Sequence, residues 1–514
     1  MKYPIGMQTF PEIINEGYVY IDKTALIHRL ITQGKWYFLA RPRRFGKSLL
    51  VSTLESLFKG QKACFEGLDI LNTDYTFTAH PVIKLELTQA DIVDADSFQR
   101  FISEQAQDLA EEHQITLTST RFERQFKELI TRLHKKTGKT VVLLIDEYDK
   151  PILNTLESDK LSKVKSALNA FYAMVKSLDQ YLRFVFITGV SKFSKVSVFS
   201  GMNNLDDISL DSDYATLCGY TKKELTHYFD ASINQLAHTL DIPQEDAYKQ
   251  IEQWYNGYVF SENCEGVFNP FSILSLLKKR QFQNYWFLSA TPTFLIERLK
   301  AKQYDLSQLD NLQIAPEGLS ASEPENTSIQ ALLLQTGYLT IKSRSESLYQ
   351  LDFPNKEVRD SFFKSIVEQY AYIEKGIGPI HIEALKNGFK HQDLALVFST
   401  LTQFFANLPY DIAIQEERYY QSIFFAVFKL LGFLIEVEVS TNKGRIDCVV
   451  WTDNRIYIIE FKLNGTKEDA LQQIKDKQYA QKYTGLGKHL SLLGVAFDQK
   501  ERNIQDWIEE AFIE

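Results

Sequence analysis

The sequence has little of what secreted, membrane-spanning or zinc-stabilised proteins need. Its 514 residues include four cysteines, which are scattered along the chain without close pairing and therefore argue against a disulfide framework or a zinc site. The N-terminal residues contain no apolar run of the signal-peptide type, and no later stretch approaches the roughly 20 consecutive apolar residues that span a bilayer. We therefore expect a cytoplasmic protein with no membrane partner.

An excess of positive charge is also missing. The formal net charge is −9, so the chain as a whole does not attract nucleic acid, and any such contact must be local. Two basic clusters qualify, and the one near the C-terminus is more simply a solvated helix face. The first cluster is Arg41, Arg43, Arg44 and Lys47, and the second is Lys475, Lys477, Lys482 and Lys488. The remaining composition is that of an ordinary globular protein, long enough for roughly three domains.

Short apolar runs that alternate with helical patterns occupy the first part of the chain. The runs are WYFLA (36–40), VIKLEL (82–87), VVLLIDEYD (141–149) and FVFITG (184–189). Strands that are apolar on both faces predict a mainly parallel sheet covered by helices on both sides, the three-layer αβα architecture of P-loop NTPases. We expect this domain over residues 1–220, a mainly helical lid or linker over 221–395, and a second α/β domain over 396–514.

The sequence RPRRFGKS (41–48) stands between the first predicted strand and a predicted helix. A phosphate loop needs backbone N–H groups that point inward, a lysine for the terminal phosphates and a Ser or Thr hydroxyl for Mg²⁺. Lys47 and Ser48 match the last two requirements, although Arg41 replaces the usual first glycine. We expect the segment Arg44, Phe45, Gly46, Lys47 and Ser48 to bind the phosphates of ATP.

Two acids and a threonine complete the predicted nucleotide site. Asp146 and Glu147 follow an apolar strand, at the edge where open α/β sheets bind ligands. We expect Asp146 to bind Mg²⁺ with Ser48, and Glu147 to orient or deprotonate the attacking water. Thr188 ends another strand, where it either senses the γ-phosphate or is a simple strand end. Arg43 and Arg44 have three interpretations: a phosphate contact, a contact to a partner subunit, or a structural role.

The segment RIDCVVWTDNRIYIIEFKL (445–463) contains two strands around an Asp-Asn turn. If that turn has two residues, Asp447 lies directly opposite Glu460, with their Cβ atoms about 5 Å apart. Lys462 is on the same face as Glu460, because side chains alternate along a strand. Two carboxylates and an ammonium suit phosphodiester hydrolysis, in which Asp447 and Glu460 bind Mg²⁺ or Mn²⁺ and Lys462 stabilises charge. An edge hairpin with polar ends is the alternative.

These motifs resemble a family of bacterial proteins with an N-terminal AAA-ATPase-like domain and a C-terminal PD-(D/E)XK nuclease-superfamily domain. Similar segments run through nearly the whole chain, among them YIDKTALI, LARPRRFGKSLL, LIDEYDKP, WYNGYVF and GRIDCVV…YIIEFKL. The resemblance implies that Asp447, Glu460 and Lys462 are the nuclease core and that Glu417 is its auxiliary acid. It also implies a Gln and a Tyr on the next helix. Gln473 and Tyr479 are the candidates, although their spacing does not place them on one face of a continuous helix.

We therefore expect an ATP-binding and ATP-hydrolysing protein coupled to a metal-dependent nuclease that acts on nucleic acid, DNA more than RNA. A homo-oligomer through the ATPase domain would fit this interpretation. Two other classes stay open: a nucleotide-gated switch whose C-terminal domain binds nucleic acid or a protein without cutting it, and a plain NTPase with a structural tail. Asp447, Glu460 and Lys462 together favour the nuclease.

Overall fold

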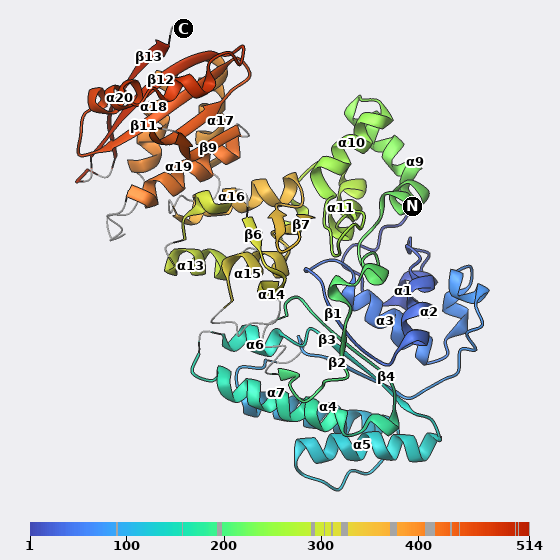
Figure 1. Ribbon diagram of the computed structural model, residues 1–514. Coiled ribbons are helices and arrows are strands. Elements are labelled where there is room, and N and C mark those ends of the chain that lie inside the picture. Colours follow the sequence, from blue (N-terminus) through green and yellow to red (C-terminus); the bar gives the residue numbers. More distant parts are fainter. Residues whose placement is uncertain are drawn as a thin grey trace. The chain divides into compact units, whose positions relative to one another are not determined.

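The computed structural model describes most of the chain, in two compact units (Figure 1). The described residues are 1–88, 91–156, 158–192, 198–288, 293–302, 304–309, 312–319, 327–370, 378–406, 417–431, 434–441, 443–498, 500–501 and 503–512. The first unit comprises residues 1–290 and 312–358, and the second comprises 291–311 and 359–514. Whether the chain has three domains with the predicted boundaries stays a prediction. Among the described residues, no helix combines the length and the apolar character that crossing a membrane requires.

A five-stranded sheet, parallel throughout, forms the centre of the first unit. Its strands are β1 (Trp36–Ala40), β2 (Val82–Glu86), β3 (Val141–Asp146), β4 (Leu182–Gly189) and β5 (Asp206–Asp207). They lie in the order β2-β3-β4-β1-β5. Strand β4 therefore separates β1, which leads into the RPRRFGKS loop, from β3, which ends in Asp146. The carboxyl ends of these three strands meet at one edge.

Helices cover both faces of this sheet, as Figure 1 shows. They are α1 (Phe10–Asn15), α2 (Thr24–Gln33), α3 (Lys47–Phe58), α4 (Ala95–Glu112), α5 (Phe122–Thr137), α6 (Lys150–Thr155) and α7 (Leu161–Lys176). One large apolar cluster joins α4, α5 and α7 to the strands, while α3 packs on the other face. This three-layer arrangement confirms the predicted α/β fold. It follows from strands that are apolar on both sides, since each face must then be covered.

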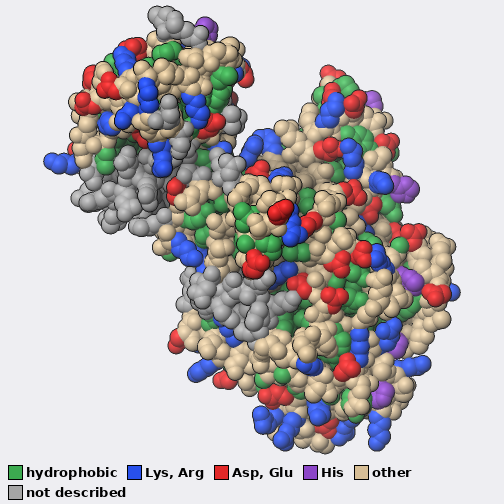
Figure 2. Space-filling view, in the orientation of Figure 1, with side chains coloured by type: hydrophobic (Ala, Val, Ile, Leu, Met, Phe, Trp, Pro, Cys, Tyr) green, Lys and Arg blue, Asp and Glu red, His purple; other side chains and the backbone are tan. Residues whose placement is uncertain are grey.

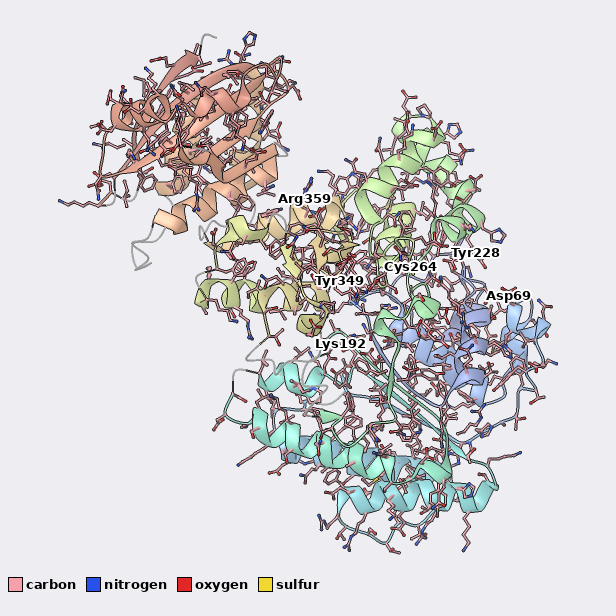
Figure 3. All side chains as sticks on the ribbon, in the orientation of Figure 1. Asp69, Lys192, Tyr228, Cys264, Tyr349 and Arg359 are labelled. Atoms are coloured by element: carbon pink, nitrogen blue, oxygen red, sulfur yellow. The ribbon has the colours of Figure 1, made fainter. Side chains whose placement is uncertain are left out.

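A helical group follows the sheet in the same unit. It consists of α9 (Lys222–Leu240), α10 (Gln244–Tyr255), α11 (Pro270–Lys279) and α12 (Tyr285–Leu288), around an apolar core of its own. Asp22 and Lys23, which directly precede α2, connect this group to the rest of the unit. Lys23 forms an ion pair with Glu224 at 2.6 Å, and the hydroxyl of Tyr228 accepts a hydrogen bond from the N–H of Asp22. A carboxylate oxygen of Asp22 accepts the N–H of Asp69; Figure 3 labels Asp69 and Tyr228.

The middle region also contains a small antiparallel sheet, which the sequence analysis did not predict. Its strands β6 (Leu312–Ile314), β7 (Thr340–Arg344) and β8 (Tyr349–Asp352) lie in the order β6-β8-β7. The short helices α14 (Pro316–Leu319) and α15 (Ile329–Thr336) precede β7. These strands are short and mostly polar at their ends, so they carry little of the apolar signal that identified β1 to β4.

The second unit is built around a mixed five-stranded sheet in the order β13-β12-β11-β10-β9. The strands are β9 (Leu434–Thr441), β10 (Gly444–Trp451), β11 (Arg455–Leu463), β12 (His489–Asp498) and β13 (Asn503–Phe512). β10 and β11 form the predicted antiparallel hairpin, and β11 pairs with β12 in parallel. The crossover between β11 and β12 contains helix α20 (Lys467–Asp476), which packs on both of these strands.

Helices cover the other face of this sheet. The helices of the second unit besides α20 are α13 (Thr293–Ala301), the larger part of α16 (Lys356–Tyr370), α17 (Gly378–His391), α18 (Leu394–Ala406) and α19 (Glu417–Leu431). The sequence of the segment that begins at residue 380 suggests a connector, but its described part, 380–406, contributes to this unit's core. Phe398 of α18 stacks on Trp507 at 4.7 Å between ring centroids, and Phe389 of α17 meets Tyr457 at 5.5 Å.

Candidate functional site

The RPRRFGKS loop joins β1 to α3 and turns through two left-handed residues. Gly46 has φ = 90°, and Arg44 has φ = 67°, a conformation that L side chains adopt at some cost. Helix α3 begins at Lys47, so its free N–H groups point toward the loop. An N-terminus of this kind, preceded by a tight loop, favours the binding of an anion such as phosphate.

The side chain of Lys47 is buried, with 5% exposed, and reaches back over the loop. Its Nζ donates hydrogen bonds to the carbonyl oxygens of Arg41, at 3.0 Å, and Pro42, at 3.1 Å. Its positive charge also favours the ionised forms of Asp146 and Glu147, so the three groups share one electrostatic environment. Phosphate oxygens are stronger acceptors than carbonyls, so the same ammonium can exchange these bonds for a charged ligand.

Asp146 ends β3 and is almost fully buried. Burial raises the pKa of its carboxyl group, whereas a hydrogen bond with the Ser48 hydroxyl opposes the rise. Its Oδ1 has no hydrogen-bond partner, and neither has the buried hydroxyl of Thr188 on the adjacent strand β4. A buried carboxylate oxygen without a partner is costly, and a cation would satisfy it. Asp146 and Ser48 therefore fit a Mg²⁺ ion through the chemistry of their oxygen donors.

Glu147 follows Asp146 with φ = 54°, a left-handed conformation that a glutamate rarely adopts. Burial raises the pKa of its carboxyl group, and the charge of Lys47 opposes that rise. Left-handed backbone at a non-glycine residue is held only where the surroundings require it, and such residues cluster at functional sites. The position of Glu147 fits the role of proton acceptor that the sequence suggested.

A cavity of about 430 Å³ opens beside these groups. Its lining includes the predicted Arg44, Gly46, Lys47, Ser48 and Glu147, together with residues that sequence reasoning missed: Pro4, Gly6, Met7, Gln8, Glu86, Thr88, Lys150, Tyr220, Pro270, Phe271 and Leu274. The volume lies in the range of small-ligand pockets. Of the missed residues, Glu86 could have been found, because it ends a parallel strand beside Asp146. Lys150 follows the acids of the DEYDK segment, and the others come from segments without a charge pattern.

Three other side chains of the loop are held by contacts within the protein. Phe45 is buried against Tyr258 and Phe260, with ring centroids 4.7 and 5.3 Å away, so only its backbone can face a ligand. The guanidinium of Arg44 lies over the ring of Phe271, 4.9 Å from its centroid. Arg44 lines the cavity through this contact with α11.

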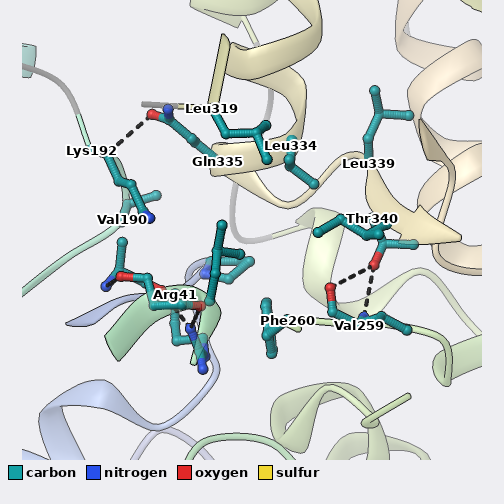
Figure 4. A pocket seen from close by; sticks show the side chains of 15 residues that line it. Arg41, Val190, Lys192, Val259, Phe260, Leu319, Leu334, Gln335, Leu339 and Thr340 are labelled. Atoms are coloured by element: carbon teal, nitrogen blue, oxygen red, sulfur yellow. Dashed lines mark hydrogen bonds between the residues drawn. The ribbon is translucent and has the colours of Figure 1, made fainter. Parts of the chain in front are cut away.

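Arg41 is the third of these side chains, and it is 1% exposed. Its guanidinium donates to the carbonyl oxygens of Ser209, at 2.7 Å, and Tyr214, at 3.1 Å, and lies 4.1 Å from the ring centroid of Phe260. Burial lowers its pKa to about 10. Figure 4 shows Arg41 and Phe260 at the wall of a narrow, mainly apolar cavity of about 50 Å³. Arg41 therefore stabilises the loop by connecting it to the segment that contains Ser209 and Tyr214.

The hairpin in the second unit has the predicted register. Cys448 pairs with Ile459, and Trp451 pairs with Ile456, so Asp447 stands opposite Glu460. The N–H of Phe461 donates to Asp447 Oδ2 at 2.9 Å, and the N–H of Asp447 lies 3.5 Å from Glu460 Oε2. The two carboxylates therefore interact with the backbone of the facing strand.

Gln473 of α20 connects the charged groups of the hairpin. Its Nε2 donates to Glu460 Oε1, and its Oε1 accepts from Lys462 Nζ. Tyr479 reaches the same cluster and donates its hydroxyl to the carbonyl of Arg445 at 2.8 Å. Both side chains reach the cluster despite their spacing, because α20 ends at Asp476 and Gln478 has φ = 52°. The single helix that the sequence suggested is thus two segments that meet at a turn.

Glu460 is 2% exposed. Burial, and then the negative charge of Asp447, raise the pKa of its carboxyl group to about 8, although Lys462 and Gln473 oppose the rise. A buried acid and a half-buried acid that repel each other suit a divalent cation, so this donor set fits Mg²⁺ or Mn²⁺. Within the described residues no cluster of three metal-ligating side chains occurs, and the side chain of Glu417 lies outside them.

Two lysines of the second basic cluster have partners within the second unit. Lys475 forms an ion pair with Glu510 at 2.6 Å, and Lys488 donates to the carbonyls of Thr452 and Asp453 in the hairpin turn. Over the face that Figure 2 shows, Lys and Arg side chains are interspersed with Asp and Glu. Whether nucleic acid binds near the hairpin stays a prediction.

Comparisons with known proteins match these two sites. The family model described as a predicted AAA-ATPase matches residues 4–199, and the model of the PD-(D/E)XK nuclease superfamily matches residues 415–507. A relative from Azotobacter chroococcum mcd 1, named "Uncharacterized protein in vnfD 5'region", is 38% identical over 529 residues, with 99% of each chain covered. A signal transduction ATPase with numerous domains and a tetratricopeptide repeat sensor, from Pyrococcus horikoshii, is a solved structure that shares 14% identity over 80% of this chain and 54% of its own. Its TM-score is 0.25, so this likeness supports no conclusion.

Proposed function

Because the chain belongs to the family that joins a predicted AAA-ATPase domain to a PD-(D/E)XK nuclease-superfamily domain, we propose that it hydrolyses ATP at the first site and cleaves nucleic acid at the second. The observation that carries the nuclease proposal is the convergence of Asp447, Glu460 and Lys462, the last two of which Gln473 connects. Opposed acids at a largely buried position are costly, and this cost is understandable in a hydrolytic site. DNA is the preferred substrate in this proposal.

At the first site each residue has a separate role, which follows from its position. The N–H groups at the start of α3 and the ammonium of Lys47 hold the phosphates of ATP. Ser48 and Asp146 hold Mg²⁺, which neutralises charge on the phosphates when it is bound. Glu147 accepts a proton from the attacking water, and Thr188 stands between β1 and β3 to contact the γ-phosphate. The apolar wall of Tyr220, Phe271 and Leu274 accommodates the base.

At the second site Asp447 and Glu460 hold one or two Mg²⁺ or Mn²⁺ ions, which polarise the scissile phosphate. Lys462 stabilises the charge that develops on the phosphate and positions the water, while Gln473 fixes the ammonium and Glu460 relative to each other. Tyr479 anchors the segment after α20 to β10 through Arg445. Glu417 is the auxiliary acid in this proposal.

We propose that the nucleotide state of the first site controls the second. A switch that binds nucleic acid without cutting it is the competing function, and the paired acids speak against it. The test is a panel of linear, circular and single-stranded DNA and of RNA, each incubated with and without ATP, Mg²⁺ and Mn²⁺. We expect metal-dependent cleavage that is lost in Asp447→Ala and altered in Lys47→Ala.

Asp453→Ala is the matched control, because Asp453 is an exposed acid in the turn of the same hairpin. We expect this variant to cleave like the unmodified chain. Cleavage that persists in Asp447→Ala would contradict the nuclease assignment. Tight binding of nucleic acid without cleavage under either metal would favour the switch.

A further inference from the structure

Transfer of a phosphoryl group needs positive charge beside the γ-phosphate, and many P-loop proteins obtain it from an arginine of a partner. The loop of this chain contains three arginines, and their side chains differ in position. Arg41 is buried and bonded to carbonyls, and Arg44 lies over Phe271. Arg43 is exposed and lines the phosphate cavity. Within the described residues its guanidinium has no hydrogen bond or ion pair, so it is available to a ligand.

Arg43 lies close to the residues that we propose take part in hydrolysis. It lines the same cavity as Lys47, Ser48 and Glu147. The positive charge of Arg43 also reaches Glu147, where it opposes the effect of burial on the carboxylate. A cation near both the phosphate-binding lysine and the proton acceptor stands where charge develops during hydrolysis.

The backbone of Arg43 is held in place by the region before α16. Trp286 donates its indole Nε1–H to the carbonyl of Arg43 at 3.0 Å. The N–H of Trp286 in turn donates to Glu357 at 2.7 Å, and Pro42 packs so closely on Gly337 that an added Cβ there would lie 2.6 Å away. The loop is therefore fixed on both sides of the arginine. A fixed backbone lowers the cost of placing the guanidinium.

We propose that Arg43 is a catalytic residue that acts in cis on the transferring phosphoryl group, with Trp286 as its positioning residue. This inference rests on the proposed ATP hydrolysis. In the reaction the oxygen of water forms a bond to the γ-phosphorus, while the bond to the bridging oxygen breaks and ADP leaves with that electron pair. One proton of the water passes to Glu147 and then to solvent. Arg43 donates hydrogen bonds to the γ-phosphoryl oxygens as their charge rearranges.

A cis arginine has a consequence for assembly. Each chain then contains all the groups for hydrolysis, so the rate per chain does not depend on protein concentration. An oligomer through the ATPase domain would serve another purpose, such as organising the nuclease.

The test compares Arg43→Ala and Arg43→Lys with the unmodified chain in single-turnover hydrolysis of ATP with Mg²⁺. Arginines of this type contribute about 10³-fold or more to the rate, so we expect Arg43→Ala to lose a factor of that order and Arg43→Lys to be intermediate. Affinity for ADP should stay within a few-fold, whereas affinity for ADP with aluminium fluoride, a mimic of the transferring group, should fall with the rate. Arg124→Ala, an exposed arginine on α5, is the control and should change neither quantity.

Trp286→Phe tests the positioning role, because it keeps an aromatic ring but removes the N–H. We expect Trp286→Phe alone to lower the rate of ATP hydrolysis. Added to Arg43→Ala, it should lower the rate no further. An unchanged rate in Arg43→Ala would overturn the proposal, as would an equal loss of ADP affinity and rate. Restored hydrolysis on mixing Arg43→Ala with Lys47→Ala chains would overturn action in cis. If the unmodified chain binds ATP but does not hydrolyse it, the proposed ATPase function itself fails.

Discussion

Arg41→Gly introduces the residue that usually opens a phosphate loop, yet we expect it to destabilise the first unit. The substitution removes the donor to two buried carbonyls, those of Ser209 and Tyr214, and the contact with Phe260. A buried carbonyl left without its donor costs about 1–3 kcal/mol, and a desolvated cation–π contact contributes about 0.5–2 kcal/mol. Two such carbonyls and the ring contact sum to roughly 2.5–8 kcal/mol, which corresponds to a fall in Tm of about 4–11 °C for a unit of this size.

Thermal unfolding and ATP binding should be measured on Arg41→Gly, with Arg41→Ala to separate the loss of the side chain from the freedom of glycine. Affinity should fall as well, because Lys47 is anchored on the carbonyl of Arg41. Arg43→Gly is the matched control for stability, since it changes an exposed arginine of the same loop, and its Tm should move by about 2 °C or less. An unchanged or higher Tm in Arg41→Gly would refute the reasoning.

Three further predictions concern Glu357, Gln473 and Tyr479. Burial raises the pKa of Glu357 to about 8 from an unfolded value of 4.5, so the folded state holds a proton that the unfolded state releases over this range. The free energy of unfolding of the first unit should fall as pH rises from 4.5 to 8, by about 1.4 kcal/mol per pH unit at most, and Glu357→Gln should flatten this dependence in urea unfolding at each pH. A steeper fall in the variant would contradict this. Gln473→Leu should lower Mn²⁺ affinity and the rate of cleavage by about 10–100-fold, because it removes the hydrogen bonds that connect Lys462 and Glu460. An unchanged affinity and rate would show that these two hydrogen bonds are dispensable. Tyr479→Phe should cost about 1 kcal/mol in the stability of the second unit, measured by urea unfolding, because the carbonyl of Arg445 loses its donor; no change would mean that water replaces the hydroxyl as donor.

The sequence predicted what depends on local pattern. The strands β1, β3 and β4 are short apolar runs, and the order of strand, loop and helix around Lys47 follows from them. The register of the hairpin followed from the two-residue turn at Asp453 and Asn454, because the turn alone determines which residues face each other. Opposed acids at Asp447 and Glu460 were therefore accessible without any structure.

Long-range contacts were not accessible in this way. The bond from Trp286 to Arg43 joins residues 243 positions apart, and that from Arg41 to Ser209 joins residues 168 apart. No local pattern encodes such pairs, so the sequence could not predict which of the loop arginines is buried and which is exposed. The end of α20 was missed for another reason: Gln478 adopts the left-handed conformation without being a glycine or asparagine, and the sequence gives no stop signal there.

The hydrogen bond between Trp286 and Arg43 also gives the protein an optical reporter of its own. Indole emission responds to the dipoles and hydrogen bonds around its N–H, and this N–H points at the backbone of the phosphate loop. The chain contains five tryptophans, so a variant that keeps only this one would turn occupancy of the loop into a change of fluorescence. Filling and emptying of the site could then be followed in real time without a labelled nucleotide.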